Sequence, residues 1–226
     1  QLLIGLIRIF QIVIQSLRNS WFCNGKRLGV DRGFNIITSS LKVSPISEPE
    51  FDILFSPILV KDVSYIAVGV SGGSDSLALS WLLHRWCEQI GIRLIALTVD
   101  HRLRPNSSKD ARNVSLWLKS WGLNCIILPW VGNKPSTGIQ ETARIARYKL
   151  MIDWCIENGV RDLALAHHQE DQAETFLMRL SRGSGIDGLA CMREVTFREG
   201  VRLLRPLLTV PKSRLRATLK SQNQEW

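Results

Sequence analysis

The chain has 226 residues, of which 45% are hydrophobic and 22% are charged, and its formal net charge is +9 at pH 7. This composition is that of an ordinary globular protein with a buried core, and it excludes a largely disordered chain. The five cysteines are widely spaced and form no CxxC pair, so they indicate neither a zinc site nor a disulfide scaffold. Reduced thiols in a cytoplasmic protein fit this pattern best.

The positive charge lies mainly in the second part of the chain. Residues 61–226 hold 23 Lys and Arg against 16 Asp and Glu. Two interpretations are open. The charge is either a general property of the surface or the mark of a bound polyanion, such as a nucleic acid, whose counterions are released on binding.

Residues 1–60 read as an N-terminal extension followed by a linker. The apolar run 1–17 contains Arg8 and is shorter than the ~20 residues of a membrane helix. It resembles a transit peptide or signal anchor, but sequence upstream of the true start, with initiation near Val43, is favoured because the first methionine is Met151. We expect a short helix at 48–56, within a segment rich in Pro and Ser. A helical pattern from residue 211 runs to Trp226, so the domain at 61–226 is expected to be truncated at its C-terminal end.

Strand and helix patterns alternate from residue 64 onward. Apolar runs with β-branched residues predict strands, and the segments between them have helical periodicity. Such alternation predicts an α/β fold with a parallel sheet and helices on both faces. The expected strands are 64–70, 93–100, 124–130 and 162–167, and the expected helices are about 75–90, 107–121, 138–158 and 169–182.

Polar clusters follow three of these strands. They are Ser71–Ser76, then Asp100, His101 and Arg102, and finally His167 and His168. Ligands of parallel sheets bind outside the carboxyl ends of the strands, so the three clusters are expected to converge at one edge. A sheet that only supported the fold would not require polar clusters at the same edge.

The segment SGGSDS (71–76) joins the first strand to the first long helix. Its glycines permit close approach of the backbone, its serines donate hydrogen bonds, and the helix presents its positive N-terminus. These features suit a compact anion such as pyrophosphate, whereas the Lys of a Walker A loop is missing. Asp75 would repel a phosphate unless a cation lies between them, which predicts Mg²⁺. The alternative is a glycine turn with Ser and Asp as helix caps.

SGGSDS resembles the signature of the PP-loop ATPases, which split ATP between its α- and β-phosphates. Further stretches resemble one branch of these enzymes, the tRNA(Ile)-lysidine synthase family. They are VDHRLR (99–104), QETARIARY (140–148), the block AHHQEDQAETFLMRLSRGSGIDGLACM (166–192) and RPLL (205–208). The resemblance covers residues 66–208 and implies a Rossmann-like fold of the adenine nucleotide α-hydrolase type. Glu170 departs from the family, which more often has Asp there.

The resemblance implies that ATP and Mg²⁺ are used to join free L-lysine to the first anticodon cytidine of a tRNA(Ile) with a CAU anticodon. It implies a cytoplasmic enzyme that does not associate with a membrane, and it is compatible with a homodimer. The residues expected in catalysis are Asp75, Arg144, His168 (a proton acceptor for the incoming amine), Asp171 and Glu174. ATP is expected at Ser71, Gly72, Gly73, Ser74, Asp75, Ser76, Asp100 and His101, with Mg²⁺ at Asp75. Substrate contacts are expected from Glu141, Arg147, Arg179 and Arg182.

Several alternatives stay open at this point. Another PP-loop enzyme, such as a tRNA thiolase, would keep the ATP chemistry, although the cysteine pairs of thiolases are missing. A truncated copy that binds nucleotide or tRNA without turnover is a non-catalytic alternative. The carboxylate that binds the lysine ammonium is one of Asp100, Glu141, Asp171 and Glu174. The Glu141 and Arg144 pair is also explained by a solvated ion pair on a helix face.

Overall fold

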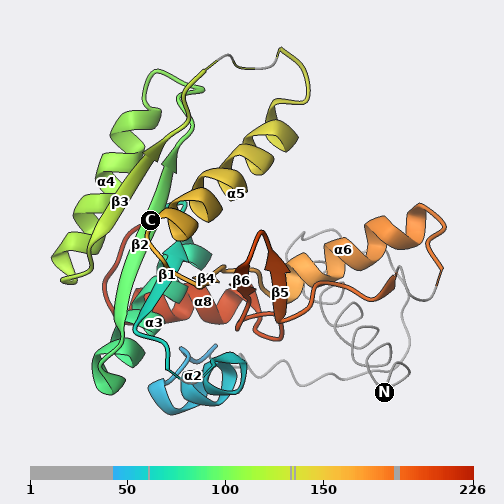
Figure 1. The fold of residues 1–226 in the computed structure, drawn as a ribbon. Coiled ribbons are helices and arrows are strands. Elements are labelled where there is room, and N and C mark those ends of the chain that lie inside the picture. The colour runs from blue at the N-terminus through green and yellow to red at the C-terminus, as the bar shows by residue number, and fades with distance from the viewer. Residues whose placement is uncertain (1–42, 61, 133, 135, 186–188) are drawn as a thin grey trace, which may run out of the picture.

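The computed structural model describes residues 43–60, 62–132, 134, 136–185 and 189–226. The expectations about residues 1–42 lie outside this part of the chain. The elements in chain order are α2 (Glu48–Phe55), the 3-10 turn η1 (Ser56–Ile58), β1 (Tyr65–Gly69), α3 (Ser74–Ile90), β2 (Arg93–Asp100), α4 (Ser107–Ser120), β3 (Cys125–Pro129), α5 (Ile139–Glu157), β4 (Asp162–Ala164), α6 (Gln169–Ser181), β5 (Val195–Arg198), β6 (Val201–Leu204) and α8 (Lys212–Ser221) (Figure 1).

The strands form one six-stranded sheet in the order β3-β2-β1-β4-β6-β5. All neighbouring strands are parallel except β5 and β6, with β1 between β2 and β4 at the centre. The α/β fold with helices on both faces is therefore confirmed. The β5–β6 hairpin was not expected. Its turn has φ values of 52° at Glu199 and 83° at Gly200, as in a type I′ turn, but its strands are too short to stand out in the sequence.

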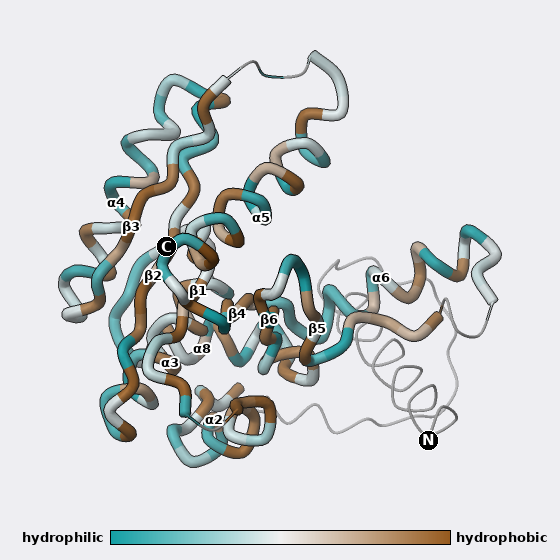
Figure 2. Tube along the Cα trace, in the orientation of Figure 1, coloured by the Kyte–Doolittle hydropathy of each residue, from teal (hydrophilic) through white to brown (hydrophobic). Residues whose placement is uncertain are grey.

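Two apolar cores flank the sheet because side chains alternate along each strand. Ile66 and Val68 of β1 point into a core shared with α2, α3, α4 and α8. Ala67 between them points into the opposite core, where it packs with Met151 and Ile152 of α5. Figure 2 shows this distribution as hydrophobic segments along the strands of the sheet and hydrophilic ones along the outer helices. None of the described helices has the length and apolar character required to cross a membrane.

Helix α6 projects away from the rest of the molecule (Figure 1). It packs through a small cluster of its own, in which Ala173 and Phe176 meet Cys191. Gln172 fixes the returning chain, because its side chain accepts from the Met192 amide and donates to the Met192 carbonyl, both at 2.8 Å. The N-terminal end of α6 therefore lies at the sheet, and its C-terminal end points away from the rest of the molecule.

Residues 43–60 were expected to be a linker with a short helix at 48–56, but apolar side chains from Ile46 to Ile58 pack into the core of the domain. The helix is present as α2, and its Phe51 and Phe55 are almost completely buried, with Phe55 edge-on to Trp86 at 4.8 Å. Arg214 of α8 holds this segment from the other side. It donates to both carboxylate oxygens of Glu50 and to the carbonyl oxygen of Ser44 at 3.0 Å.

We expect Arg214→Ala to lower the free energy of unfolding by about 1–3 kcal/mol, because several charge-assisted hydrogen bonds are lost together. The hydrogen bonds from Arg214 lower the pKa of Glu50 below its usual 4.5, against the opposing effect of burial. The stabilisation is therefore complete above pH 4.5 and is lost as the pH falls through the lowered pKa. Urea unfolding at pH 7 and at pH 3 measures both effects.

Arg216→Ala is the matched control, since Arg216 lies on the same helix with an exposed side chain. It should leave unfolding unchanged at both pH values. A difference between wild type and Arg214→Ala that persists undiminished at pH 3 would show that Glu50 is not the partner that matters.

Candidate active site

The loop between β1 and α3 brings backbone amides to the edge of the sheet. Gly72 has a φ of +84°, and a Cβ built on it would lie 2.7 Å from Cγ2 of Val114. Gly73 is the N-cap of α3, and no side chain caps the helix there. The positive N-terminal end of the α3 dipole is therefore directed toward the space above the loop.

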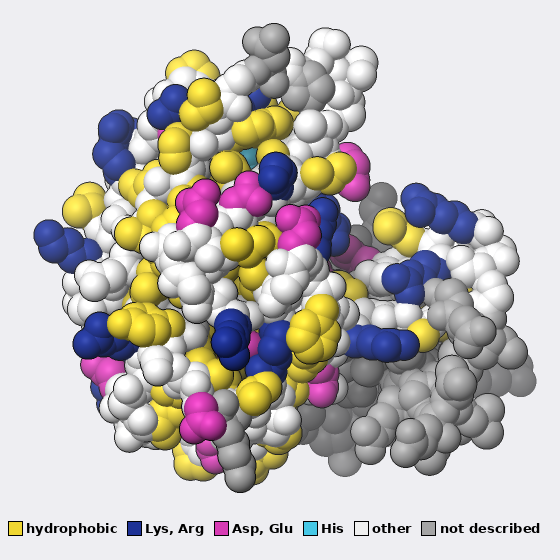
Figure 3. Space-filling model, viewed as in Figure 1, with side chains coloured by type: hydrophobic (Ala, Val, Ile, Leu, Met, Phe, Trp, Pro, Cys, Tyr) yellow, Lys and Arg dark blue, Asp and Glu magenta, His cyan; other side chains and the backbone are white. Residues whose placement is uncertain are grey.

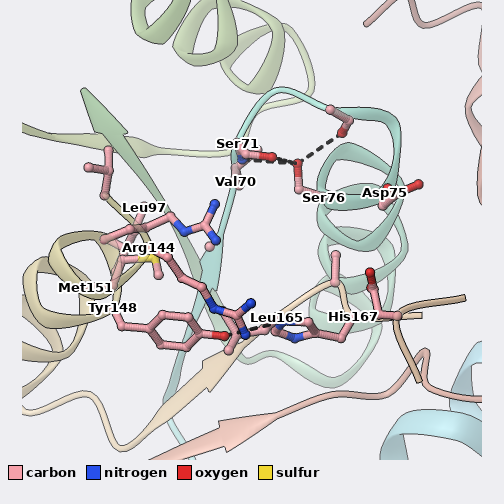
Figure 4. A pocket seen from close by; sticks show the side chains of 16 residues that line it. Val70, Ser71, Asp75, Ser76, Leu97, Arg144, Tyr148, Met151, Leu165 and His167 are labelled. Carbon is pink, nitrogen blue, oxygen red and sulfur yellow. Dashed lines mark hydrogen bonds between the residues drawn. The ribbon is translucent and has the colours of Figure 1, made fainter. Parts of the chain in front are cut away.

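Hydrogen bonds among the serines hold this loop in shape (Figure 4). The Ser76 hydroxyl accepts from the Ser71 amide at 3.1 Å and donates to the Gly73 carbonyl at 3.0 Å. The hydroxyls of Ser71 and Ser76 also lie 3.2 Å apart. The Ser76 side chain therefore stabilises the conformation of the loop from within. Fixed backbone groups of this kind suit an anion such as a phosphate.

A cavity of about 320 Å³ opens over the loop. Helix α5 forms its opposite wall, and the chain that follows β4 forms its floor (Figure 4). Arg144 and Arg147 of α5 line this cavity together with residues of the glycine loop. The lining residues from these elements are Arg144, Arg147, Tyr148 and Met151 of α5 and Leu165, Ala166 and His167 after β4.

Asp75 lies between two cationic side chains. Its Oδ2 is 3.4 Å from Nε2 of His168 and 3.1 Å from Nζ of Lys212. Burial alone would raise the pKa of Asp75, but the contacts with His168 and Lys212 outweigh it and hold this pKa at about 2. The Asp75 carboxylate is therefore ionised throughout the physiological range.

His168 is the centre of a carboxylate cluster. Glu170 and Asp171 approach its ring nitrogens at 3.1 and 3.6 Å, in addition to Asp75. Burial would lower the pKa of His168, but the carboxylates of Asp75 and Glu170 raise it to about 9. The ring is then a cation at pH 7. This charge does not suit the proton-acceptor role expected from the sequence, because a protonated imidazole has no free lone pair.

The neighbouring His167 has the opposite charge state. Burial, followed by the charges of Arg205 and Arg144, lowers its pKa to about 3, so its ring is neutral at pH 7. Its Nε2 lies 3.4 Å from the Tyr148 hydroxyl, and the two side chains point toward each other in Figure 4. His167 lines the cavity and His168 does not. Two adjacent histidines thus differ in charge because of their surroundings.

Asp100 and His101 lie beside the cavity and not in its lining. The Asp100 carboxylate is buried and accepts from the hydroxyls of Ser107 and Ser108, both at 2.5 Å, and from the Arg102 amide at 3.1 Å. It therefore fixes the start of α4. This structural role differs from the ATP contact expected for Asp100, and three hydrogen bonds within the chain already occupy its carboxylate.

Of the expected site residues, the structure brings Ser71, Gly73, Asp75, Ser76, Arg144, Arg147 and Asp171 together around the cavity. Gly72 and Ser74 belong to the same loop without lining it. Glu174 is exposed on α6, and Arg179 and Arg182 lie near the outer end of that helix, where Arg179 donates to the Ala190 carbonyl. Glu141 lines a second cavity. The outer positions do not touch the glycine loop.

Lys212 was missed by the sequence analysis. It follows Pro211 at the start of α8, 137 positions after Asp75, and no local pattern marks it. Its amide donates to the Glu170 carboxylate at 3.0 Å, so Glu170 caps α8 while Lys212 reaches Asp75. Packing between α3 and α8 brings these residues together. The sequence feature that could have pointed to Lys212 is the RPLL motif (205–208), which lies just before α8.

The fold and this site define the class of protein. The family model described as "PP-loop domain" matches residues 44–226, and the chain belongs to that family. The match begins close to the first described residue and includes α2. A PP-loop domain implies that the chain binds ATP, and the cavity over the glycine loop is the candidate ATP-binding cavity.

Curated relatives narrow the class. The chain is 49% identical over 179 residues to a tRNA(Ile)-lysidine synthase of Bradyrhizobium, covering 78% of this chain and 49% of the relative. It is 53% identical over 156 residues to the enzyme of the same name from Rhodopseudomonas palustris, covering 68% of this chain and 45% of the relative. The chain therefore spans about half the length of the curated relatives it matches.

A solved structure agrees with the fold. The U34-tRNA thiolase of Methanococcus maripaludis superposes with a TM-score of 0.68 at 18% identity, covering 79% of this chain and 64% of the thiolase. At this identity the likeness shows the fold alone. Cys87, Cys155 and Cys191 are buried here and Cys125 is half-buried, and none of these four described cysteines lines the cavity.

Proposed function

We propose that the protein to which this chain belongs is a tRNA(Ile)-lysidine synthase. It would use ATP to join free L-lysine to the wobble cytidine of a tRNA(Ile) with a CAU anticodon. One observation carries the proposal: residues from the glycine loop, from the helix QETARIARY and from the segment AHHQEDQAET all line a single cavity. The names of the relatives support the substrates.

The first step would activate the cytidine. The triphosphate would lie on the amides at the start of α3, with Arg144 and Arg147 facing it from α5. The C2 carbonyl oxygen of cytidine attacks the α-phosphorus, the bond to the bridging oxygen of the β-phosphate breaks, and pyrophosphate leaves. Arginine and helix dipole stabilise the negative charge that develops on the phosphates.

The donors of the cavity fit Mg²⁺ that arrives with the nucleotide. Asp75 and Asp171 both line it, while no group of three His, Cys, Asp or Glu within the described ranges could hold a metal by itself. Mg²⁺ commonly takes one or two carboxylates together with phosphate oxygens and water. Bound there by Asp75 and Asp171, it would neutralise charge on the phosphates.

The second step would introduce lysine. Its ε-amine attacks C2 of the activated cytidine and loses a proton, the C2–O bond breaks, and AMP leaves. The proton acceptor would be His167, because it lines the cavity as a neutral ring whereas His168 is already protonated. Burial and the neighbouring arginines keep the pKa of His167 low, and an anionic nucleotide beside these arginines would raise that pKa toward the working range.

The basic surface supports a tRNA partner. Figure 3 shows Lys and Arg side chains over α6 and over the adjoining part of the main body. Arg179 and Arg182 on α6 would then contact the anticodon loop through its phosphates, as the resemblance implies. The cytoplasmic location and the homodimer stay predictions.

The test is incorporation of radiolabelled lysine into tRNA by the full-length protein. We expect label in a CAU-anticodon tRNA(Ile), dependent on ATP, with one AMP and one pyrophosphate released for each lysine joined. An elongator tRNA(Met), which shares the CAU anticodon, is the control substrate and should stay unlabelled. If pyrophosphate is released in the presence of tRNA but no lysine is joined to the tRNA, the proposed use of lysine is rejected. Another tRNA modification by a PP-loop enzyme is then favoured.

A further inference from the structure

Two basic side chains contact the same oxygen of Asp75. This oxygen, Oδ2, lies 3.4 Å from Nε2 of His168 and 3.1 Å from Nζ of Lys212. Asp75 lines the candidate ATP-binding cavity (Figure 4), whereas His168 and Lys212 are not part of its lining. A carboxylate oxygen that Mg²⁺ would take as a ligand is therefore already paired within the protein. A metal ion at Asp75 must compete with one of these side chains, because like charges at one oxygen repel each other.

His168 is held at Asp75 by several contacts at once. Its side chain is only 6% exposed, and its Nδ1 lies 3.1 Å from the Glu170 carboxylate. Its backbone is fixed as well, because the His168 amide donates to the Asp171 carboxylate at 2.9 Å. Moving His168 away from Asp75 would break buried ion pairs, which is strongly unfavourable. His168 is therefore not the side chain that gives way.

Lys212 combines a fixed backbone with a movable side chain. Its amide donates to both carboxylate oxygens of Glu170, at 3.0 and 3.2 Å. Helix α8, which begins at Lys212, is anchored in the core by Leu215 and Leu219. The side chain of Lys212 is 38% exposed, and among the described residues its ammonium group forms an ion pair with Asp75 alone. The flexible four-carbon stem of a lysine lets this ammonium group move while the helix stays in place.

Glu170 determines where Lys212 begins. Its carboxylate contacts the His168 ring and caps the first amide of α8, so the starts of α6 and α8 lie side by side. Glu170 stands where the resembled family more often has Asp. The longer side chain of Glu serves this double contact in the present chain. The backbone of Lys212 is therefore fixed relative to Asp75 and the glycine loop.

We propose that Lys212 is a counterion of Asp75 that is exchanged for a metal ion when the nucleotide binds. Without ATP, the ammonium group of Lys212 stays on Asp75 and disfavours a metal ion at that carboxylate. When the triphosphate binds at the start of α3, the Lys212 side chain rotates away from Asp75 and donates to a phosphate oxygen. Asp75 is then open to Mg²⁺. The inference rests on the proposed function in its use of ATP and Mg²⁺.

The exchange couples nucleotide and metal binding. The ion pair between Lys212 and Asp75 is replaced by one between Lys212 and phosphate and one between Asp75 and the metal ion. Such coupling is reciprocal, so a metal ion on Asp75 also releases Lys212 for the phosphates. Loss of the Lys212 charge should therefore strengthen metal binding and weaken nucleotide binding. A lysine that only stabilised the fold would not affect the two ligands in opposite directions.

Metal binding is measured first, on the full-length protein without nucleotide, by electron paramagnetic resonance of Mn²⁺ in place of Mg²⁺. We expect Lys212→Met to bind Mn²⁺ at least about tenfold more tightly than the wild type, because the competing charge is gone. Lys212→Arg keeps the charge and should stay within about threefold of the wild type. Adding Asp75→Asn to Lys212→Met should abolish the gain. Lys212→Gln replaces Lys212→Met if thermal unfolding shows that the latter is not folded.

ATP binding is measured separately, by equilibrium dialysis with labelled ATP in the presence of EDTA, so that no metal ion assists. Lys212→Met should weaken this binding at least about tenfold, because the contact with a phosphate oxygen is lost. Lys149→Met is the matched control for both measurements. Lys149 also pairs with an aspartate, Asp153 at 3.0 Å, but on the exposed surface of α5. This variant should match the wild type in both measurements.

Only effects of opposite sign support the exchange. It is overturned if Lys212→Met binds Mn²⁺ no more tightly than the wild type, or if it keeps the wild-type affinity for ATP. Absence of ATP binding to the wild type in EDTA also rejects it, since Lys212 would then have no phosphate to contact before the metal ion arrives. Neither measurement uses tRNA or lysine, so lysine incorporation by the wild type decides the proposed function independently.

Discussion

Replacing Asp75 with asparagine is expected to slow tRNA-dependent release of pyrophosphate by about a thousandfold. The carboxylate lines the ATP-binding cavity, lies 3.1 Å from Lys212, and is the proposed contact to Mg²⁺. Asparagine keeps the shape of the side chain and removes its charge. The measurement is pyrophosphate release under single-turnover conditions, with the full-length protein in excess over tRNA and with saturating ATP.

The matched control is Asp110→Asn. Asp110 lies in the first turn of α4, as Asp75 does in α3, but its side chain is exposed and outside the cavity. It should release pyrophosphate at the wild-type rate. Thermal unfolding of both variants separates a chemical effect from a folding defect. An Asp75→Asn protein that is folded and within threefold of the wild-type rate would remove Asp75 from the mechanism.

Substitution of Gly72 by alanine has the second largest expected effect, a loss of about 2–5 kcal/mol of unfolding free energy. The φ of +84° costs any L side chain about 1–2 kcal/mol, and overpacking against Val114 costs a further 1–3 kcal/mol. The loop must shift to relieve the contact. Because the loop positions the phosphates, kcat/KM for ATP should fall about a hundredfold.

Gly91→Ala measures the conformational cost without the contact to Val114. Gly91 ends α3 with a φ of +75°, but a Cβ there would meet nothing within 4 Å. This variant should lose only the conformational part, about 1–2 kcal/mol, and should keep its activity. Adding Val114→Ala to Gly72→Ala should recover part of the stability. Equal losses for Gly72→Ala and Gly91→Ala in urea unfolding would show that the Val114 contact does not matter.

The different charges of His167 and His168 show that the groups around a side chain determine its protonation state. Both residues have the same type and sit next to each other after β4. His168 is surrounded by the carboxylates of Asp75, Glu170 and Asp171, whereas His167 is surrounded by the guanidinium groups of α5 and Arg205. A buried cation paired with carboxylates and a neutral ring that lines the cavity therefore lie next to each other at one edge of the sheet.

The sequence by itself determined the succession of elements. Periodicity of two and of 3.6 residues is a local property, so β1, β2 and the long helices were predicted close to their observed bounds. The glycine loop was equally local, because its backbone conformation depends on Gly72 and its neighbours. The rule that ligands bind at the carboxyl ends of parallel strands then placed Ser71–Ser76 and the chain after β4 at one cavity.

Only the tertiary structure decided which polar groups are available for chemistry. Asp100 was expected at the ATP site, but Ser107 and Ser108 use its carboxylate to begin α4. Lys212 reaches Asp75 from a helix far along the chain, and Arg205, which follows β6, helps to lower the pKa of His167, which follows β4. Burial, counterions and pKa depend on contacts between distant segments, and these contacts have no signature in a local pattern.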